Sequence, residues 1–326
     1  MTSNATDYHC GPSTHGLVSS VLPPVLIIEL LLGLPGNVIA LMIFCQNMQH
    51  WRANVTFLFN LVLSDFLLLL NLPFRIDNYW HGNKWRFGDA WCRINLFMLA
   101  VNRSASIAFL TTVAVDRYFK VVHPHHRINH MRSKQAAWVA CFIWVVVISL
   151  RMPLLANNLH STDEKNISHC RSFSNYENPP PGIQLYYVIF NLDFFLPLVL
   201  LIFCSVLIAC ILRSRKINKD KRVQRAIQTV LVIVGVFVLC FFPGIGTGLT
   251  ALYFKSLGNY YCNAYHLTSE LFEMSIAFTY LNSALDPVIY CFSSSILRNS
   301  LKQALNRTGI MELMPNRQGS VKSGRD

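Results

Sequence analysis

The chain has 326 residues, of which 53% are hydrophobic and only 13% charged, and its net charge is +12 at pH 7. An ordinary soluble domain carries about 25% charged residues, so this composition favours a membrane protein. The basic excess would suggest nucleic acid in a soluble protein. Here it gathers in short links between apolar segments, as in cytoplasmic loops, and we expect no nucleic-acid partner.

Seven apolar segments follow one another along the chain. A helix rises ~1.5 Å per residue, so about 20 residues cross the ~30 Å core of a bilayer. The segments lack the alternation of strands, and open sheets cannot satisfy their backbone in lipid. We therefore predict an all-α membrane protein, a seven-transmembrane helix bundle with a short amphipathic C-terminal helix. The spans are expected at residues 21–45, 54–79, 92–117, 135–155, 183–212, 226–254 and 264–292.

Charge and sequons predict the orientation. Basic links follow the third and fifth segments, whereas the sequons at Asn4 and Asn166 lie in the first tail and in the loop after segment four. By the positive-inside rule, the N-terminus is extracellular and the protein is a multi-pass protein of the plasma membrane. The predicted divisions are an outer tail (1–20), a transmembrane domain (21–292), an amphipathic helix at the cytoplasmic face (293–306) and a disordered cytoplasmic tail (307–326).

Four of the ten cysteines lie in the outer regions, and four cysteines allow three pairings. We favour Cys92 with Cys170, joining segment three to the long loop, and Cys10 with Cys262, joining the tail to the loop before segment seven. Free thiols are the alternative. The other six cysteines lie within apolar segments and are expected to be small core residues.

Three arginines lie in the outer halves of segments two, three and four: Arg75, Arg103 and Arg151. A charged residue inside a membrane is costly and is by default a functional-site hypothesis. These arginines would converge on an outward cavity, where a guanidinium pairs a carboxylate through two hydrogen bonds. Alternatively, they are neutralised internally by Asp77, Asp193, Glu270 or Glu273, or Arg151 simply extends to the membrane interface.

A second polar set lies at mid-depth of segments two, three and seven: Asp65, Ser106, Asn282, Ser283 and Asp286. Buried carboxylates need partners. One interpretation is a sodium ion held by carboxylate, hydroxyl and amide groups. The other is a hydrogen-bonded network with water, or one carboxylate kept protonated. We expect no other cofactor and no metal site.

Together, the motifs resemble those of the rhodopsin-like G-protein-coupled receptors, in order over residues ~20 to 305. They are Gly36–Asn37, Leu61–Asp65, Cys92, Asp116–Tyr118, Trp144, Pro197, Cys240–Pro243 and Asp286–Tyr290. More narrowly, residues 99–104, 121–126 and 278–283 resemble the hydroxycarboxylic acid receptors and the related oxoeicosanoid receptor.

The resemblance implies a receptor whose Arg103 grips a ligand carboxylate with help from Tyr280, and we add Arg75, Arg151 and Ser172 to the expected ligand set. It also implies the Cys10–Cys262 disulfide, coupling to inhibitory G proteins and a fall in cAMP; arrestin is a further expected partner. Membrane lipid would meet the basic links. The expected activation switch comprises Asp116, Arg117, Tyr118, Phe241, Pro243, Pro287 and Tyr290. Two positions depart from the common pattern: Phe241 replaces tryptophan and Asp286 replaces asparagine.

Two other classes of protein were weighed. An anion transporter would use the same arginines, but the seven spans show no internal repeat. A membrane enzyme would need a catalytic set, and no Ser-His-Asp group, zinc motif or carboxylate pair suited to acid–base chemistry is evident. Within the receptor interpretation, a short hydroxy acid such as lactate and a long oxo-fatty acid both stay open as ligands.

Overall fold

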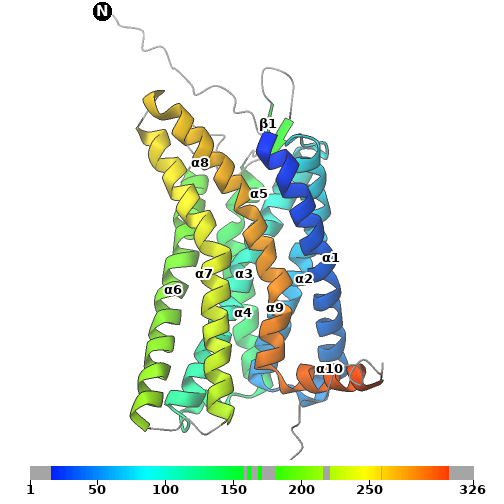
Figure 1. Ribbon diagram of the computed structural model, residues 1–326, viewed down its shortest axis with the longest axis vertical. Coiled ribbons are helices and arrows are strands. Elements are labelled where there is room, and N and C mark those ends of the chain that lie inside the picture. Colours follow the sequence, from blue (N-terminus) through cyan, green and yellow to red (C-terminus); the bar gives the residue numbers. More distant parts are fainter. Residues whose placement is uncertain are drawn as a thin grey trace, which may run out of the picture.

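The computed structural model describes residues 16–157, 160–162, 168–170, 181–215, 221–257 and 259–307. These residues form an elongated bundle of roughly parallel and antiparallel helices (Figure 1). The long apolar segments become helices because a helix satisfies all its backbone groups within one segment. The helices are α1 (Gly16–Gln46), α2 (Ala53–Trp80), α3 (Gly88–Val122), α4 (Ser133–Arg151), α5 (Pro153–Ala156), α6 (Pro181–Arg215), α7 (Lys221–Ser256), α8 (Cys262–Met274), α9 (Ile276–Ser293) and α10 (Ser295–Arg307).

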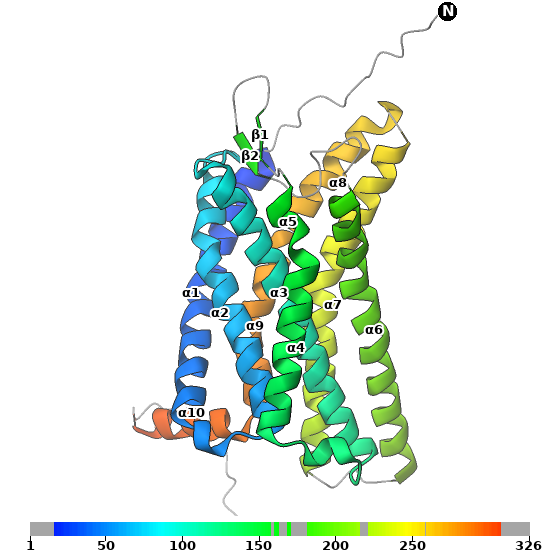
Figure 2. The same ribbon diagram turned by 180° about the vertical axis from the view of Figure 1, so that it is seen from behind.

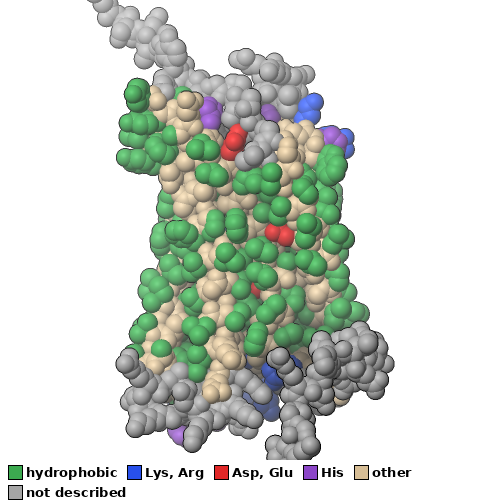
Figure 3. Space-filling view, in the orientation of Figure 1, with side chains coloured by type: hydrophobic (Ala, Val, Ile, Leu, Met, Phe, Trp, Pro, Cys, Tyr) green, Lys and Arg blue, Asp and Glu red, His purple; other side chains and the backbone are tan. Residues whose placement is uncertain are grey.

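Six of these helices, α1 to α4, α6 and α7, are long and apolar enough to cross a membrane. Helices α8 and α9 together occupy the seventh predicted segment. The predicted seven-helix bundle is therefore confirmed, although its last span is divided and α5 continues α4. Apolar side chains cover the middle of the face in Figure 3, and charged side chains lie mostly toward its ends.

The helices differ in how deeply they are buried. In the most apolar stretch of α2 and of α3, 67% of the residues are buried, against 22% for α4 and for α6. Large apolar side chains such as Trp138 and Phe142 on α4 point outward, as expected of residues that face lipid. The groups carried by α3 therefore have neighbours on several sides, which makes this helix suited to hold a site (Figure 2).

The seventh transmembrane helix, made of α8 and α9, is interrupted at Ser275. Gly244 and Gly248 of α7 face this region. A Cβ atom at Gly244 would lie 3.3 Å from the Ser275 hydroxyl, and one at Gly248 would lie 3.1 Å from the Phe272 ring. The absence of side chains at these glycines lets α7 approach α8 closely at the interruption.

One end of the bundle, here called the hairpin end, carries the strands β1 (His160–Thr162) and β2 (Ser168–Cys170). They pair antiparallel and were not predicted within the long loop. A disulfide joins Cys92 of α3 to Cys170, the pairing favoured from the sequence. The described cysteines outside disulfides are Cys45, Cys141, Cys204, Cys210, Cys240 and Cys291.

Asn83 connects several segments at this end. Its φ is +64°, a left-handed conformation that asparagine tolerates better than most residues. Its side chain accepts a hydrogen bond from Asn78 of α2 at 2.7 Å and donates one to Glu273 of α8 at 3.0 Å. Its carbonyl accepts a bond from the ring of His169 in β2 at 2.9 Å. The α2–α3 link is thereby attached to both the hairpin and helix seven.

The opposite end, here called the α10 end, is crossed by α10, which lies roughly perpendicular to the bundle (Figure 1). Leu297 is buried in the main core, and Ile296 and Leu301 pack against it. Arg298 donates a hydrogen bond to the carbonyl of Cys291 at 3.3 Å. An apolar stripe thus holds this amphipathic helix against the base of α1 and α9.

Candidate functional site

Arg103 lies on the central helix α3 and is 7% exposed. Its guanidinium carbon lies 4.2 Å from the centre of the Phe190 ring of α6 and 5.4 Å from that of Phe241 of α7. Within the described residues, no side chain or carbonyl accepts a hydrogen bond from it. Aromatic faces attract the cation but leave its in-plane donors unused, so this group is equipped to bind an anion.

Arg151 has a different environment, 2% exposed at the end of α4. It forms an ion pair with Asp193 of α6 and donates a hydrogen bond to the Ser104 hydroxyl at 2.7 Å. Ser104 in turn lies 2.5 Å from the Asp193 carboxylate. We call Arg103, Ser104, Arg151 and Asp193 the hairpin-end cluster. Of the two alternatives for Arg151, the structure has the internal partner.

Arg75 and Tyr280 form a separate polar pair on α2 and α9. Both side chains are buried, and the Arg75 cation lies within electrostatic range of the Tyr280 hydroxyl. In the described part of the chain, the Nε and Nη2 atoms of Arg75 and the hydroxyl of Tyr280 lack hydrogen-bond partners. Buried donors of this kind cost free energy unless something accepts from them, so this pair is a second place where an anion is favoured.

The mid-depth polar residues are connected by hydrogen bonds. Ser283 and Tyr290 donate to the two oxygens of Asp65, the first at 2.9 Å. Asn282 donates to Ser106 at 2.9 Å and to Asp286 at 3.0 Å. Asn37 of α1 accepts from Tyr290 at 3.2 Å and donates to the Ser283 carbonyl at 2.9 Å. We call these seven residues the mid-bundle cluster: Asn37, Asp65, Ser106, Asn282, Ser283, Asp286 and Tyr290.

The two carboxyl groups of the mid-bundle cluster, Asp65 and Asp286, are both 0% exposed. They lie within hydrogen-bonding reach of each other. Two like charges so close require either a shared proton or a cation. Among the described residues, no group of three or more His, Cys, Asp or Glu side chains could hold a metal ion. Any cation here would depend on hydroxyl and amide oxygens as well, as a small hard cation can.

The Asp116–Tyr118 triplet lies near the α10 end of α3. Asp116 accepts a hydrogen bond from Lys120 at 2.7 Å, whereas the Arg117 Nε atom is 3.8 Å away. Arg117 donates to the carbonyl of Ser293, at the end of α9, at 2.8 Å. Asp116 and Arg117 therefore form an ion pair, but Lys120 is the nearer partner of the carboxylate.

Phe241 lies in the middle of α7, beside Arg103. Its ring centre is 5.3 Å from that of Phe237, which stacks on Phe194 of α6 at 5.4 Å. Two residues farther along, Pro243 leaves its helix without one backbone donor. Pro287 of α9 packs on Gly36 of α1, where a Cβ would lie 3.0 Å from the proline ring. A shift of Arg103 would thus be transmitted to the aromatic side chains of α6 and α7.

Some predicted residues lie outside the described residues: Ser172, Cys10, Asn4 and Asn166. Cys262 is disulfide-bonded; its pairing with Cys10 stays a prediction. Sequence analysis did not select Ser104, Phe190 or Asn37 for the sites. Asn37 and Ser104 stood in recognised motifs, but the position of Phe190 carried no signal beyond ordinary helix composition.

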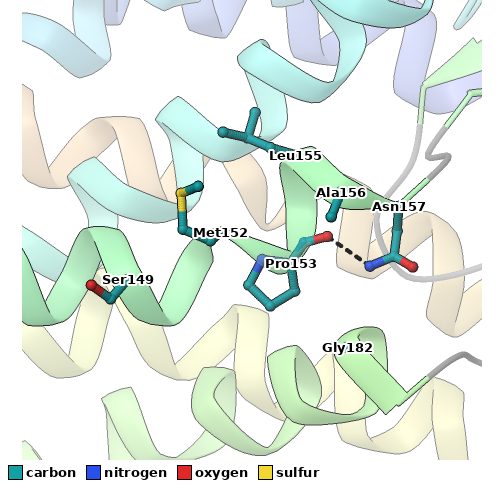
Figure 4. A pocket seen from close by; sticks show the side chains of 7 residues that line it. All are labelled: Ser149, Met152, Pro153, Leu155, Ala156, Asn157 and Gly182. Carbon is teal, nitrogen blue, oxygen red and sulfur yellow. Dashed lines mark hydrogen bonds between the residues drawn. The ribbon is translucent and has the colours of Figure 1, made fainter.

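A surface pocket of about 640 Å³ lies between α4, α5 and the start of α6 (Figure 4). Met152, Pro153 and Gly182 line it, with Asn157 bonded to the Pro153 carbonyl at 2.7 Å. Its lining has no charged side chain. This pocket therefore offers nothing to fix an ionic ligand.

Comparison with known proteins agrees with this architecture. Residues 36–290 match the family described as 7 transmembrane receptor (rhodopsin family). Human hydroxycarboxylic acid receptor 2 is 42% identical over 89% of this chain and 79% of its own length. Human oxoeicosanoid receptor 1 is 40% identical over 96% and 78%, and mouse hydroxycarboxylic acid receptor 1 is 41% identical over 94% and 86%. The chain belongs to the rhodopsin family of 7 transmembrane receptors.

Proposed function

We propose that this receptor binds a carboxylate ligand through Arg103 and, through an inhibitory G protein, lowers cAMP. In this proposal the hairpin end faces the outside of the cell and the α10 end faces the cytoplasm. The observation that carries the proposal is the Arg103 guanidinium, which is buried between two aromatic rings with no hydrogen-bond acceptor among the described residues.

The free-energy argument concerns an unpaired buried charge. Taking a guanidinium out of water costs several kcal/mol unless an opposite charge and hydrogen bonds compensate. Phe190 and Phe241 offset about 1–2 kcal/mol each at most. A ligand carboxylate would supply the rest, with two parallel hydrogen bonds to the planar fork. Tyr280 and Arg75, whose buried donors also lack partners, would hold a second polar group or an alternative carboxylate position.

The class of ligand is supported by the names of similar proteins. Two carry hydroxycarboxylic acids in their names, and a third, from mouse and 34% identical, is the 12-(S)-hydroxy-5,8,10,14-eicosatetraenoic acid receptor. All of these names denote carboxylic acids, and one of them denotes an acid with a twenty-carbon chain. We therefore propose a hydroxy or oxo carboxylic acid and leave chain length to the experiment.

Transmission would use the contacts around Arg103. A ligand acts only by its difference in affinity between two helix arrangements. A carboxylate that draws Arg103 toward itself would loosen its contact with Phe241 and so favour a different position of α7, which can bend near Pro243. At the α10 end, release of Arg117 from Asp116 and Ser293 would open the surface for the G-protein α subunit, and arrestin would compete for it.

The test is inhibition of cAMP production in cells that express the full chain. Lactate and 3-hydroxybutyrate form the short panel; 12-hydroxyeicosatetraenoic acid and a twenty-carbon oxo acid form the long one. We expect Arg103→Ala to lower the potency of the active acid at least about tenfold, since close charge pairs contribute roughly 1.5–7 kcal/mol. Arg86→Ala is the matched control, because Arg86 is exposed and already paired with Asp77 at 3.0 Å.

Two further readings complete the experiment. A tag at the N-terminus, detected on intact cells, reports both surface level and orientation. Pertussis toxin, which blocks inhibitory G proteins, should remove the response. Equal potency in wild type and Arg103→Ala would contradict the anchor role, and uptake of the acid into the cells without a cAMP response would indicate a transporter.

A further inference from the structure

The hairpin-end cluster contains two arginines but only one carboxylate. Asp193 of α6 forms an ion pair with Arg151, and Ser104 touches both of them. Arg151 also donates to Ser104 through its Nε atom at 3.2 Å and lies 5.4 Å over the Tyr186 ring. These contacts fix one partly buried carboxylate against one buried guanidinium group.

The same carboxylate is a neighbour of the proposed ligand anchor. Of the charges around Arg103, that of Asp193 acts on it most strongly. Arg103 lies 4.2 Å from the Phe190 ring, and Phe190 and Asp193 are three residues apart on α6, so these two side chains are neighbours on one face of that helix. Asp193 thus has two candidate cations, and it is in contact with only one of them.

We propose that Arg151 is a positioning residue: it holds the Asp193 carboxylate away from Arg103 and so keeps Arg103 available to the ligand. This inference rests on the proposed role of Arg103 as the carboxylate anchor. Arg151 itself does not touch the ligand. Its contribution is to bind the Asp193 carboxylate. Otherwise this carboxylate, lying beside Arg103, would occupy the hydrogen-bond donors that the ligand needs.

The physical consequence can be followed through the variants. Without Arg151, Asp193 is a partly buried charge without its cation, which is strongly unfavourable. Its nearest remaining cation is Arg103, and a new Asp193–Arg103 pair would compete with the ligand. If Asp193 is removed as well, the competitor is gone and Arg103 is free again. A residue that only supported the fold, or that bound the ligand directly, would not show this recovery.

The experiment measures the potency of the active carboxylic acid, surface level and basal cAMP for Arg151→Met, Asp193→Asn and the double variant. We expect Arg151→Met to lower potency roughly 10- to 100-fold, as expected for a new charge pair at the site. Asp193→Asn and the double variant should stay within about threefold of wild type. The matched control is the exposed pair: Arg86→Met, alone and with Asp77→Asn, should leave potency unchanged.

Three results would overturn the inference: unchanged potency in Arg151→Met, equal loss in the single and double variants, or a loss in Asp193→Asn as large as in Arg103→Ala. If Arg151→Met does not reach the surface, Asp193→Asn and the double variant still test the inference, because a loss in either as large as in Arg103→Ala would overturn it. A wild-type chain silent to every acid, or full potency in Arg103→Ala, would overturn the proposed function and this inference with it. Loss in both Arg103→Ala and the double variant would reject only the positioning role.

Discussion

The hairpin-end cluster and the mid-bundle cluster are both buried and polar, yet their charge balances are opposite. The first has two guanidinium groups and one carboxylate. The second has two carboxyl groups, Asp65 and Asp286, and no cationic side chain among its seven members. One is short of an anion and the other of a cation or a proton.

The difference also concerns how completely each cluster is satisfied. At the hairpin end, no described residue accepts a hydrogen bond from Arg103, whereas in the mid-bundle cluster most polar groups are hydrogen-bonded to one another. A partly satisfied network of buried polar groups is costly. We interpret the hairpin-end cluster as the place where a ligand supplies the missing partner. The mid-bundle cluster is then part of the fixed framework relative to which the helices move.

The largest effect is expected at the mid-bundle cluster. If sodium supplies the missing charge, it should stabilise the purified receptor by roughly 1–2 kcal/mol relative to choline, because it binds only the folded state. Asp65→Asn should abolish the difference between the two salts. The measurement is the melting temperature of detergent-solubilised protein at constant ionic strength.

Glu29→Gln is the matched control for the sodium experiment. Glu29 is a buried carboxylic acid of α1 outside the mid-bundle cluster, so this variant should keep the sodium effect. If wild type melts at the same temperature in both salts, the shared-proton alternative is favoured instead.

A smaller effect is expected from the loss of a single hydrogen bond between the Tyr280 hydroxyl and the ligand. Tyr280→Phe keeps the buried ring but removes the unpartnered hydroxyl. Because one hydrogen bond contributes about 1 kcal/mol, agonist potency should fall about fivefold. The measurement is a titration of cAMP inhibition at matched surface levels. Tyr253→Phe, an exposed tyrosine of α7, should leave potency unchanged, and an equal effect of the two substitutions would contradict a local role for Tyr280.

The smallest effect is expected at the α10 end, where the Arg117 Nε atom is 3.8 Å from Asp116 and Lys120 is the nearer partner of the carboxylate. Asp116→Asn removes the carboxylate that lies 3.8 Å from Arg117. A pair of this kind contributes about 0.2–1 kcal/mol, so basal signalling should rise by about two- to threefold. The readout is cAMP without ligand. Lys120→Met leaves Asp116 entirely to Arg117 and should not raise basal signalling; a silent Asp116→Asn variant would argue against the pair as a restraint.

The sequence was sufficient to predict the helices because each must satisfy its backbone in lipid, and apolar length alone reveals that requirement. It did not reveal the interruption at Ser275. No proline or glycine occupies that position, and the glycines that allow the close approach, Gly244 and Gly248, lie on another helix. The left-handed turn at Asn83 was hidden for a similar reason, since its partners come from α2, α8 and β2.

At the candidate site, residue types were predictable but partners were not. Intramembrane arginines are conspicuous in a sequence, so Arg75, Arg103 and Arg151 were all selected. Four acids were considered as internal partners, and only the fold shows that Asp193 pairs with Arg151 rather than Arg103. Helices α3, α4 and α6 meet at a point that linear order does not specify.

The disulfides give the molecule mechanical polarity. Cys92, Cys170 and Cys262, the described cysteines in disulfides, all lie at the hairpin end, where Asn83 adds further ties. The described helices meet at the α10 end through noncovalent contacts such as that of Arg117 with Ser293. Strain introduced near the disulfides has little room to relax at the hairpin end. Strain is therefore expected to be relieved at the α10 end, where the helices are free to move relative to one another.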